Sequence, residues 1–262
     1  MKLKYLELKK KDAIATIWLN RPEVHNAFHD GMISELIEVL KQVGNDEGIR
    51  LLTLRGKGKS FSAGADIKWM SRSIEFSFEQ NLKESLNLSD CLYSIYSFPK
   101  PTIAIVHGAC FGGANGVLAA CDFVIAHEHT TFSLSEVKIG LIPACIAPYI
   151  LKRLGEYNTK SLMLRGDRIN SVEALKIGLV NFSGTDGENS AELKGLINDL
   201  LTSGPEAVTK SKKLIEHVAN VWTLEEARVK TAEIISKIRS SDEGQEGMKA
   251  FLEKRKPCWM GQ

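Results

Sequence analysis

The sequence predicts an α/β protein, because strand-like and helix-like segments alternate over most of its length. Short apolar runs predict strands near residues 4–9, 13–19, 49–55, 102–106 and 122–127, with a short one near 180–182. Apolar residues recur at helical spacing in the segments between them. Such alternation indicates helices layered on a sheet. After Asp186 the pattern becomes helical only.

The individual elements follow from local patterns taken in chain order. The opening segment, MKLKYLELKKKDAIATIWL, alternates apolar and polar residues as the strands of a hairpin do. Two helices are predicted from apolar residues three or four positions apart: Met32, Leu36, Leu40 and Val43, then Leu82, Leu86, Leu88 and Leu92. Two later helix starts are predicted at Ser203-Gly204-Pro205-Glu206 and Ser240-Ser241-Asp242-Glu243.

Composition argues against several classes of protein. Lys and Arg number 34 against 32 Asp and Glu, so no strong positive field favours nucleic acid. No apolar run approaches the ~18 residues of a membrane span, and the start lacks the long apolar core of a signal peptide. The five cysteines and six histidines show no metal-binding spacing. We expect a cytoplasmic protein without metal or disulfides, in which Cys110 and Cys121 are buried thiols.

The most informative stretch, residues 107–143, combines a glycine-rich turn with one carboxylate. HGACFGGANGVLAACD has neither the Lys-Ser/Thr of a P-loop nor the G-x-G-x-x-G spacing, which argues against nucleotide triphosphates and dinucleotides. A glycine turn that opens a helix directs backbone N–H groups at a ligand. The alternative is that Gly112 and Gly113 only let the helix lie close to the preceding strand.

Glu136 lies in the apolar, hydroxyl-rich segment TFSLSEVKIGLIP. Poor solvation there should favour the protonated carboxyl group, which suits a proton carrier. The alternative is structural, because residues 133–136 match the capping-box pattern S-x-x-E.

A second loop of small residues, KSFSAGADIK over residues 59–68, also joins a strand to a helix. Its backbone can approach a ligand closely, and Asp66 is placed to cap the helix that follows. An oxyanion hole needs two converging backbone N–H groups. The loops ending at Ala65 and Gly113 can supply one each.

With these motifs the chain resembles the enoyl-CoA hydratase/isomerase family, the crotonases. The resemblance runs through Asn20-Arg21-Pro22 with Asn26-Ala27, FSAGADIKWM, KPTIAIVHGACFGGANG, ACDFVIA, SLSEVKIGLIP and SSDEGQEGMKAFLEKRKP. It implies a spiral core of stacked ββα units over 1–195 and a C-terminal helical trimerisation region over 196–262. It also implies an acyl-CoA thioester substrate, no separate cofactor, and a homotrimer or homohexamer.

The resemblance further implies the roles of individual residues. The N–H groups of Ala65 and Gly113 would hold the thioester oxygen, and Glu136 matches the family's second catalytic glutamate. Residues implied to contact the substrate or its coenzyme A part are Lys59, Ala63, Asp66, Ile67, Lys68, Phe251 and Lys254. Isolated lysines are also common surface residues, and Phe251 also suits the inward face of an ordinary amphipathic helix.

One position departs from the family pattern. Hydratases of the family usually have a first catalytic glutamate in the helix after the glycine loop, and this chain has Gly116 there. A single glutamate that moves a proton between carbons suits a double-bond isomerase. The segments FGGANGVLAACD and SLSEVKIGLIPACIAPYI instead resemble bacterial hydratases of the methylglutaconyl-CoA type, so we favour hydration. Asn115 and His107 are the spare polar groups nearby, without an assigned role.

A binding role is the alternative from another class. Some relatives of this family bind RNA, and the loss of a glutamate at residue 116 is compatible with lost catalysis. The basic residues are mostly scattered lysines apart from short runs at 9–11 and 254–256, which disfavours RNA.

Arg72 is a candidate partner for a second carboxylate on the acyl group.

Overall fold

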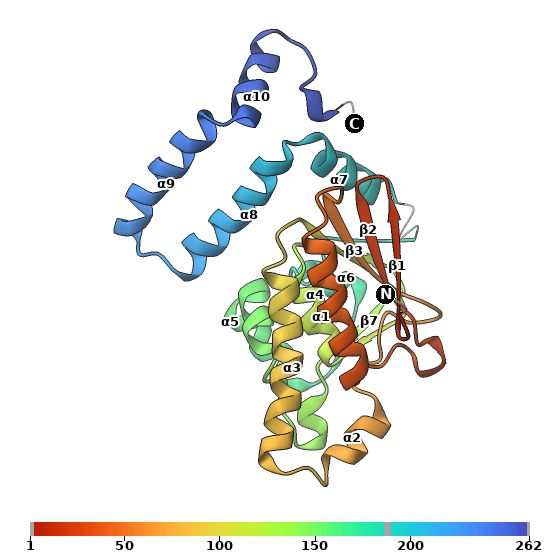
Figure 1. Cartoon of the computed structure of the whole chain (residues 1–262). Coiled ribbons are helices and arrows are strands. Elements are labelled where there is room, and N and C mark those ends of the chain that lie inside the picture. The colour runs from red at the N-terminus through yellow and green to blue at the C-terminus, as the bar shows by residue number, and fades with distance from the viewer. Residues whose placement is uncertain (1–2, 186–189, 261–262) are drawn as a thin grey trace. The chain divides into compact units, whose positions relative to one another are not determined.

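A computed structural model describes residues 3–185 and 190–260 of the chain. The chain divides into two compact units (Figure 1). The first unit comprises Met1–Phe98 and Thr102–Leu193, and the second comprises Pro99–Pro101 and Lys194–Gln262. This division falls close to the expected boundary between residues 195 and 196.

The first unit alternates strands and helices, as the sequence predicts. Its strands are β1 (Leu6–Lys11), β2 (Ile14–Leu19), β3 (Leu51–Gly56), β4 (Thr102–Val106), β5 (Ala109–Phe111), β6 (Phe123–His127), β7 (Thr131–Ser133), β8 (Arg168–Asn170) and β9 (Phe182–Gly184). Its helices are η1 (Pro22–Val24), α1 (Asp30–Gly44), α2 (Ile67–Ser73), α3 (Phe78–Tyr96), α4 (Gly113–Ala120), η2 (Glu136–Ile139), α5 (Ala147–Arg165) and α6 (Ser171–Lys176).

Two sheets share these strands. The larger has the order β1-β2-β3-β4-β6-β9; β1 and β2 are antiparallel and the other neighbours are parallel. The smaller has the order β5-β7-β8. The chain passes from the large sheet to the small one at β4–β5 and again at β6–β7. Ser62, which follows β3, forms a bridge with Cys110 of β5 and so joins the small sheet in the same way.

The three strands that the sequence analysis missed, β5, β7 and β8, form this small sheet. Each has three residues, which is too short to establish a periodicity of two. They pair with partners distant in sequence, such as Phe111 with Ser133. Tertiary pairing therefore defines these strands.

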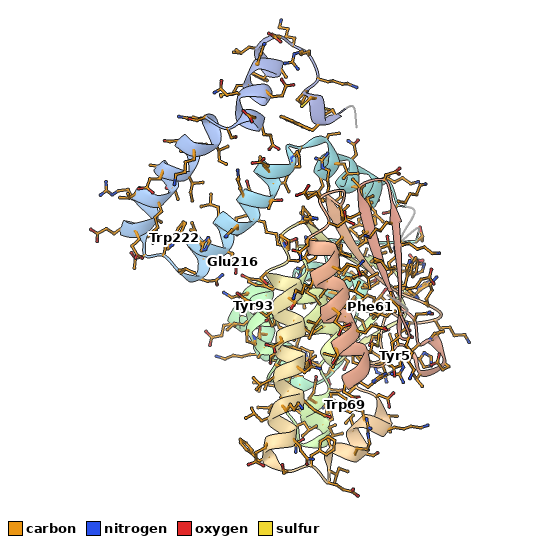
Figure 2. All side chains as sticks on the ribbon, in the orientation of Figure 1. Tyr5, Phe61, Trp69, Tyr93, Glu216 and Trp222 are labelled. Carbon is orange, nitrogen blue, oxygen red and sulfur yellow. The ribbon has the colours of Figure 1, made fainter. Side chains whose placement is uncertain are left out.

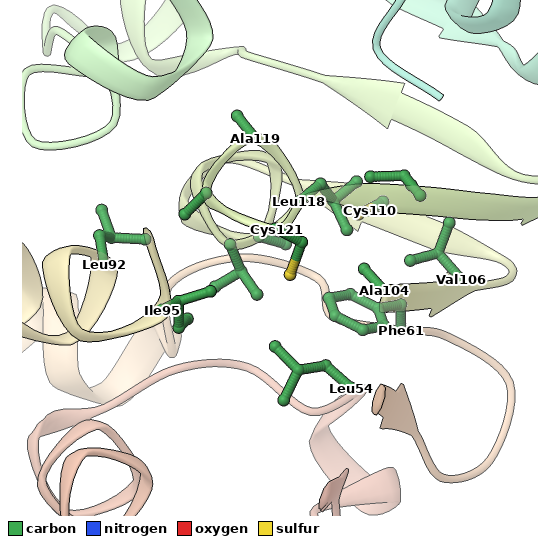
Figure 3. Packing of buried hydrophobic residues seen from close by; sticks show 14 of the residues in the cluster. Leu54, Phe61, Leu92, Ile95, Ala104, Val106, Cys110, Leu118, Ala119 and Cys121 are labelled. Carbon is green, nitrogen blue, oxygen red and sulfur yellow. The ribbon is translucent and has the colours of Figure 1, made fainter. Parts of the chain in front are cut away.

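Helices α1, α3 and α4 pack with the large sheet around a single core. All four apolar residues predicted to face inward from α1 are buried, but the prediction for α3 is partly wrong. Leu82 and Leu86 are 45% and 53% exposed, whereas Leu92 and Ile95 are buried. Only the C-terminal half of α3 packs in the core, and Figure 3 shows Leu92 and Ile95 there with Cys121. Cys110 and Cys121 are buried free thiols, as predicted.

The second unit is helical among its described residues. It contains most of α7 (Ala191–Thr202), then α8 (Pro205–Asn220), α9 (Leu224–Arg239), α10 (Asp242–Leu252) and η4 (Cys258–Met260). Both predicted helix starts are confirmed, with Gly204 and Ser241 as the N-cap residues of α8 and α10. Glu243 of α10 accepts hydrogen bonds from the first N–H groups of α8, at 2.9 Å from Glu206 and 2.7 Å from Ala207. No helix of the described segments is long and apolar enough to span a bilayer.

Candidate active site

A pocket of about 530 Å³ lies in the first unit, where two turns, two helices and the η2 segment meet. Ala65 and Gly113 belong to its wall, and so does Glu136. Trp69, Met70 and Ser73 of α2 line another part, and α3 contributes residues from its N-terminal half. The structure therefore places the three predicted catalytic residues on one cavity.

The two small-residue turns lie against each other because glycine permits it. Gly64 has φ +92°, and a Cβ atom there would come within 2.9 Å of the carbonyl oxygen of Phe111. Gly112 has φ +51°, and its Cβ would be 3.9 Å from the Gly64 Cα atom. Both conformations disfavour any residue with a side chain. Gly64 and Gly112 are therefore required for the close approach of the two turns, in addition to any role in packing the helix against the strand.

The backbone hydrogen bonds leave one amide free in each turn. The N–H groups beside Ala65 are engaged: Gly64 donates to Ser62 Oγ at 3.2 Å and Asp66 donates to the Phe28 carbonyl at 2.9 Å. Gly112 donates to the Ser133 carbonyl at 2.9 Å. Within the described residues, the Ala65 and Gly113 N–H groups donate to no protein acceptor. Gly113 is also the first residue of α4, where the helix dipole favours negative charge.

Asn115 fixes the glycine turn from beneath. Its side chain is buried, and Nδ2 lies 2.9 Å from the Ser133 carbonyl, 3.1 Å from that of Cys110 and 3.3 Å from that of Gly112. One amide group thus ties β5, β7 and the start of α4 together. Asn115 therefore has a structural partner set, and it does not line the pocket. His107 is engaged elsewhere, with Nε2 2.9 Å from the Gly58 carbonyl.

Glu136 begins η2 and turns its carboxyl group toward Gly112. A Cβ atom on Gly112 would lie 3.3 Å from Glu136 Oε1. Glu136 Oε2 is buried and has no hydrogen-bond partner in the described chain. Burial raises the pKa of Glu136 above its ordinary value, and a hydrogen bond from its own backbone N–H opposes part of that shift. The capping-box alternative is wrong, because the N-cap of η2 is Ser135 and it makes no side-chain cap.

Gly116 is packed against another side chain and leaves no room for one of its own. A Cβ atom there would lie 2.3 Å from Cγ2 of the buried Ile146 and 3.3 Å from Cδ2 of Leu92. Real contacts of this kind are ~3.5–4.0 Å. Hydratases of the family usually have a glutamate at this position. In this chain Ile146 occupies the space that the side chain of such a glutamate would need.

The predicted coenzyme A contacts fall into two groups. Ala63 lines the pocket. Lys59, Ile67 and Lys68 lie within five residues of Ala63 in the sequence and are exposed. Asp66 caps α2 by accepting from the Lys68 N–H at 2.9 Å, and its other oxygen lies 2.8 Å from Arg21 Nη2. These bonds hold the pKa of Asp66 below its ordinary value despite the opposing effect of burial, which is the largest single contribution.

The remaining two contacts, Phe251 and Lys254, belong to the second unit. Phe251 is 84% exposed, so the expectation that it faces inward from an amphipathic helix is wrong within this single chain. Lys254 follows α10 and has φ +54°.

Sequence reasoning expected residues from Trp69 onward at the acyl pocket but missed the wall that α3 contributes. Trp69 of α2, labelled in Figure 2, lines the pocket, and its indole N–H is buried without a partner in the described chain. From α3, the residues facing the pocket are Asn81, Glu84, Ser85 and Leu88. These residues are three, four and seven positions apart, so they lie on one face of the helix. Most of them are polar, and a search for apolar periodicity therefore does not detect this face. Lys138 also lines the pocket, whereas Arg72 does not.

Comparison with known proteins identifies the family of this chain. The family model for enoyl-CoA hydratase/isomerase matches residues 9–262. A crystal structure of an enoyl-CoA hydratase from Shewanella pealeana is 39% identical, has a TM-score of 0.94, and overlaps 98% of this chain and 97% of that one. A crotonyl-CoA hydratase of Syntrophomonas wolfei is 33% identical over 95% of each chain. A mitochondrial Delta(3,5)-Delta(2,4)-dienoyl-CoA isomerase of Dictyostelium discoideum is 30% identical over 98% of this chain and 91% of its own.

The chain belongs to the enoyl-CoA hydratase/isomerase family and is an enzyme of that family. The predicted crotonase-type α/β fold with C-terminal helices is confirmed.

Proposed function

We propose that this enzyme adds water across the 2,3 double bond of a branched enoyl-CoA thioester. The observation that supports this most directly is that two unengaged amides, on Ala65 and Gly113, share one pocket with the Glu136 carboxyl group, whose Oε2 has no partner in the described chain. Such amides stabilise negative charge on a thioester oxygen, and a removed donor of this kind typically costs ~10²–10³ in turnover.

In the proposed reaction the thioester carbonyl accepts hydrogen bonds from the Ala65 and Gly113 N–H groups. Attack of water oxygen at C3 forms the C–O bond and moves the π electrons toward C2 and the carbonyl oxygen. The enolate charge is then held by the two amides. Protonated Glu136 delivers its proton to C2, and the added water oxygen loses one proton to solvent, which leaves the neutral 3-hydroxyacyl thioester. Glu136 then regains a proton from solvent, so one water is added in total. The raised pKa of Glu136 maintains the donor form to higher pH than for an exposed glutamate.

The acyl group that we propose is a branched one with a second carboxylate, of the methylglutaconyl type. Support comes from the resemblance in residues 111–122 and 133–150 and from Lys138, a cation on the pocket wall. The Lys138 side chain is 59% exposed, and its partner Asp167 is 3.9 Å away, so the ammonium group is little committed to it. Arg72, the cation considered from the sequence, is 62% exposed and lies 3.5 Å from Asp30.

Double-bond isomerisation is the second candidate, and a specific observation favours it. Ile146 fills the space beside Gly116, so the family's first glutamate has no substitute on α4. A pocket in which Glu136 alone moves protons can shift one between C2 and C4. An isomerase among the relatives is compatible with this chemistry.

The absorbance of the conjugated thioester distinguishes the candidates. The protein is mixed separately with crotonyl-CoA, with a branched enoyl-CoA and with a 3-enoyl-CoA. Loss of absorbance with either of the first two supports hydration, and a gain with the third supports isomerisation. No change with all three would support a binding protein instead.

The same assay tests Glu136. Glu136→Gln should lower turnover by ~10²–10⁴-fold, because it removes the positioned acid while keeping the shape of the side chain. Acyl-CoA binding, measured by calorimetry, should change little. Turnover close to that of the unchanged protein would remove Glu136 from the mechanism.

The coenzyme A contacts complete the proposal. We assign Lys59, Ile67 and Lys68, with the backbone around Ala63 and Asp66, to the nucleotide part of the substrate. Phe251 and Lys254 would meet that part across a subunit boundary in a cytoplasmic homotrimer or homohexamer. The high exposure of Phe251 in the single chain is compatible with burial by a neighbouring copy.

A further inference from the structure

The α3 wall of the pocket provides a second carboxylate. Among the described residues, the carboxylates lining this cavity are Glu136, on η2, and Glu84, on α3. Glu84 is half-buried, and its side chain makes no hydrogen bond or ion pair within the described chain. Its neighbours on the same helical face are Asn81 and Ser85. A free carboxylate among polar groups is suited to binding and orienting water.

Contacts link this turn of α3 to Gly116, the position where hydratases of the family usually have a glutamate. The Cys145 thiol lies 3.6 Å from the Ser85 carbonyl oxygen, and the next residue, Ile146, packs on Gly116. Cys145 and Ile146 are consecutive residues, and adjacent Cα atoms are ~3.8 Å apart. These two residues therefore connect Ser85 of α3 with Gly116 of α4. Further along α3, Leu92 also reaches the Gly116 position. Glu84 therefore lines the pocket from a turn of α3 that is linked through Cys145 and Ile146 to the Gly116 position.

We propose that Glu84 is the base that activates water in this enzyme, a role that rests on the proposed hydratase function. The Glu84 carboxylate takes a proton from water as the water oxygen bonds to C3. The π electrons move into the enolate held by Ala65 and Gly113, and Glu136 gives its proton to C2. One water is added, and the two carboxyl groups return to their starting forms by exchanging one proton each with solvent.

The test separates the two carboxylates with two reactions of the same protein. Hydration of an enoyl-CoA needs Glu84 and Glu136, whereas exchange of the C2 hydrogen of butyryl-CoA with D₂O needs only Glu136 and the two amides. Glu84→Gln should lower kcat for hydration by ~10²–10⁴-fold, because it removes the positioned base. Exchange, followed by NMR, should persist. Glu136→Gln should abolish both reactions.

Two further variants complete the design. Glu79→Gln makes the same chemical change on an exposed residue of α3 that does not line this pocket, and it should leave both reactions unchanged. In Glu84→Ala, added formate should restore part of the hydration rate, because a small carboxylate can occupy the vacated space.

Each outcome decides the proposal. Hydration by Glu84→Gln at nearly the normal rate would overturn the role of Glu84 and leave the hydratase function standing. Loss of exchange together with hydration in both Glu84 variants would also overturn it, because Glu84 would then support the shared machinery. Failure of the unchanged protein to hydrate any enoyl-CoA would overturn the hydratase function itself, and the role of Glu84 with it.

Discussion

Gly116→Ala tests whether Ile146 truly fills the position of the family's missing glutamate. The added methyl group would lie 2.3 Å from Ile146 Cγ2 and 2.8 Å from Ile146 Cβ. Ile146 is 2% exposed and cannot move aside into solvent. Overpacking of this kind typically costs ~1–3 kcal/mol, and the better helix propensity of alanine returns at most ~1 kcal/mol. We expect a net loss of ~1–2 kcal/mol in the free energy of unfolding.

A double-mutant cycle isolates the contact. Ile146→Ala alone should cost ~2–5 kcal/mol through the cavity that it leaves. The double variant should cost less than the sum of the two, by ~1–3 kcal/mol, because the methyl group added at residue 116 then occupies space that Ile146 vacates. Urea unfolding followed by circular dichroism measures each term, provided that the slopes agree.

The matched control for this cycle is Gly113→Ala at the start of the same helix. No atom lies within 4 Å of a Cβ placed there, so we expect a change within ~0.5 kcal/mol. If Gly116→Ala is as stable as the unchanged protein, or if the cycle is additive, the steric reasoning is refuted. Room for a glutamate at residue 116 would then exist.

Three other perturbations follow from the site. The pKa of Glu136 is raised in the folded state. Its favourable contribution to the free energy of unfolding is therefore fully present below the ordinary pKa of 4.5 and is lost as pH rises through the raised pKa. Thermal unfolding should therefore show Glu136→Gln gaining stability relative to the unchanged protein as the pH is raised above 4.5; a difference independent of pH would contradict this. Asn115→Ala removes the donor shared by three carbonyl groups and should cost ~1–3 kcal/mol in urea unfolding, together with a lower kcat; unchanged values of both would contradict the positioning role. Lys138→Gln should raise KM for a dicarboxylic enoyl-CoA ~5-fold or more and leave that for crotonyl-CoA unchanged, as expected for a lost charge-assisted contact; equal effects on both substrates would argue against the second carboxylate.

The local sequence was enough to predict the principal elements of the fold. Strands of five or six residues and helix α1 have clear periodicity, and the cap residues Gly204 and Ser241 mark the helices that follow them. The three-residue strands β5, β7 and β8 could not be predicted, because their hydrogen bonds join segments such as 109–111 and 131–133 that carry no pattern of their own. The inward face of α3 was partly misassigned because helical spacing does not show how far along a helix the core extends, and Leu82 and Leu86 lie in the half that stays exposed.

The chemistry of the site divides in the same way. The sequence by itself determined that two turns of small residues and one poorly solvated carboxylate, Glu136, occur in this chain, because glycine conformation and side-chain ionisation are local properties. Only the tertiary structure decided that Ile146 closes the space beside Gly116 and that Glu84 shares a pocket with Glu136. Those facts depend on which surfaces the packed core brings together, and no short-range pattern encodes a contact between residues so far apart in the chain.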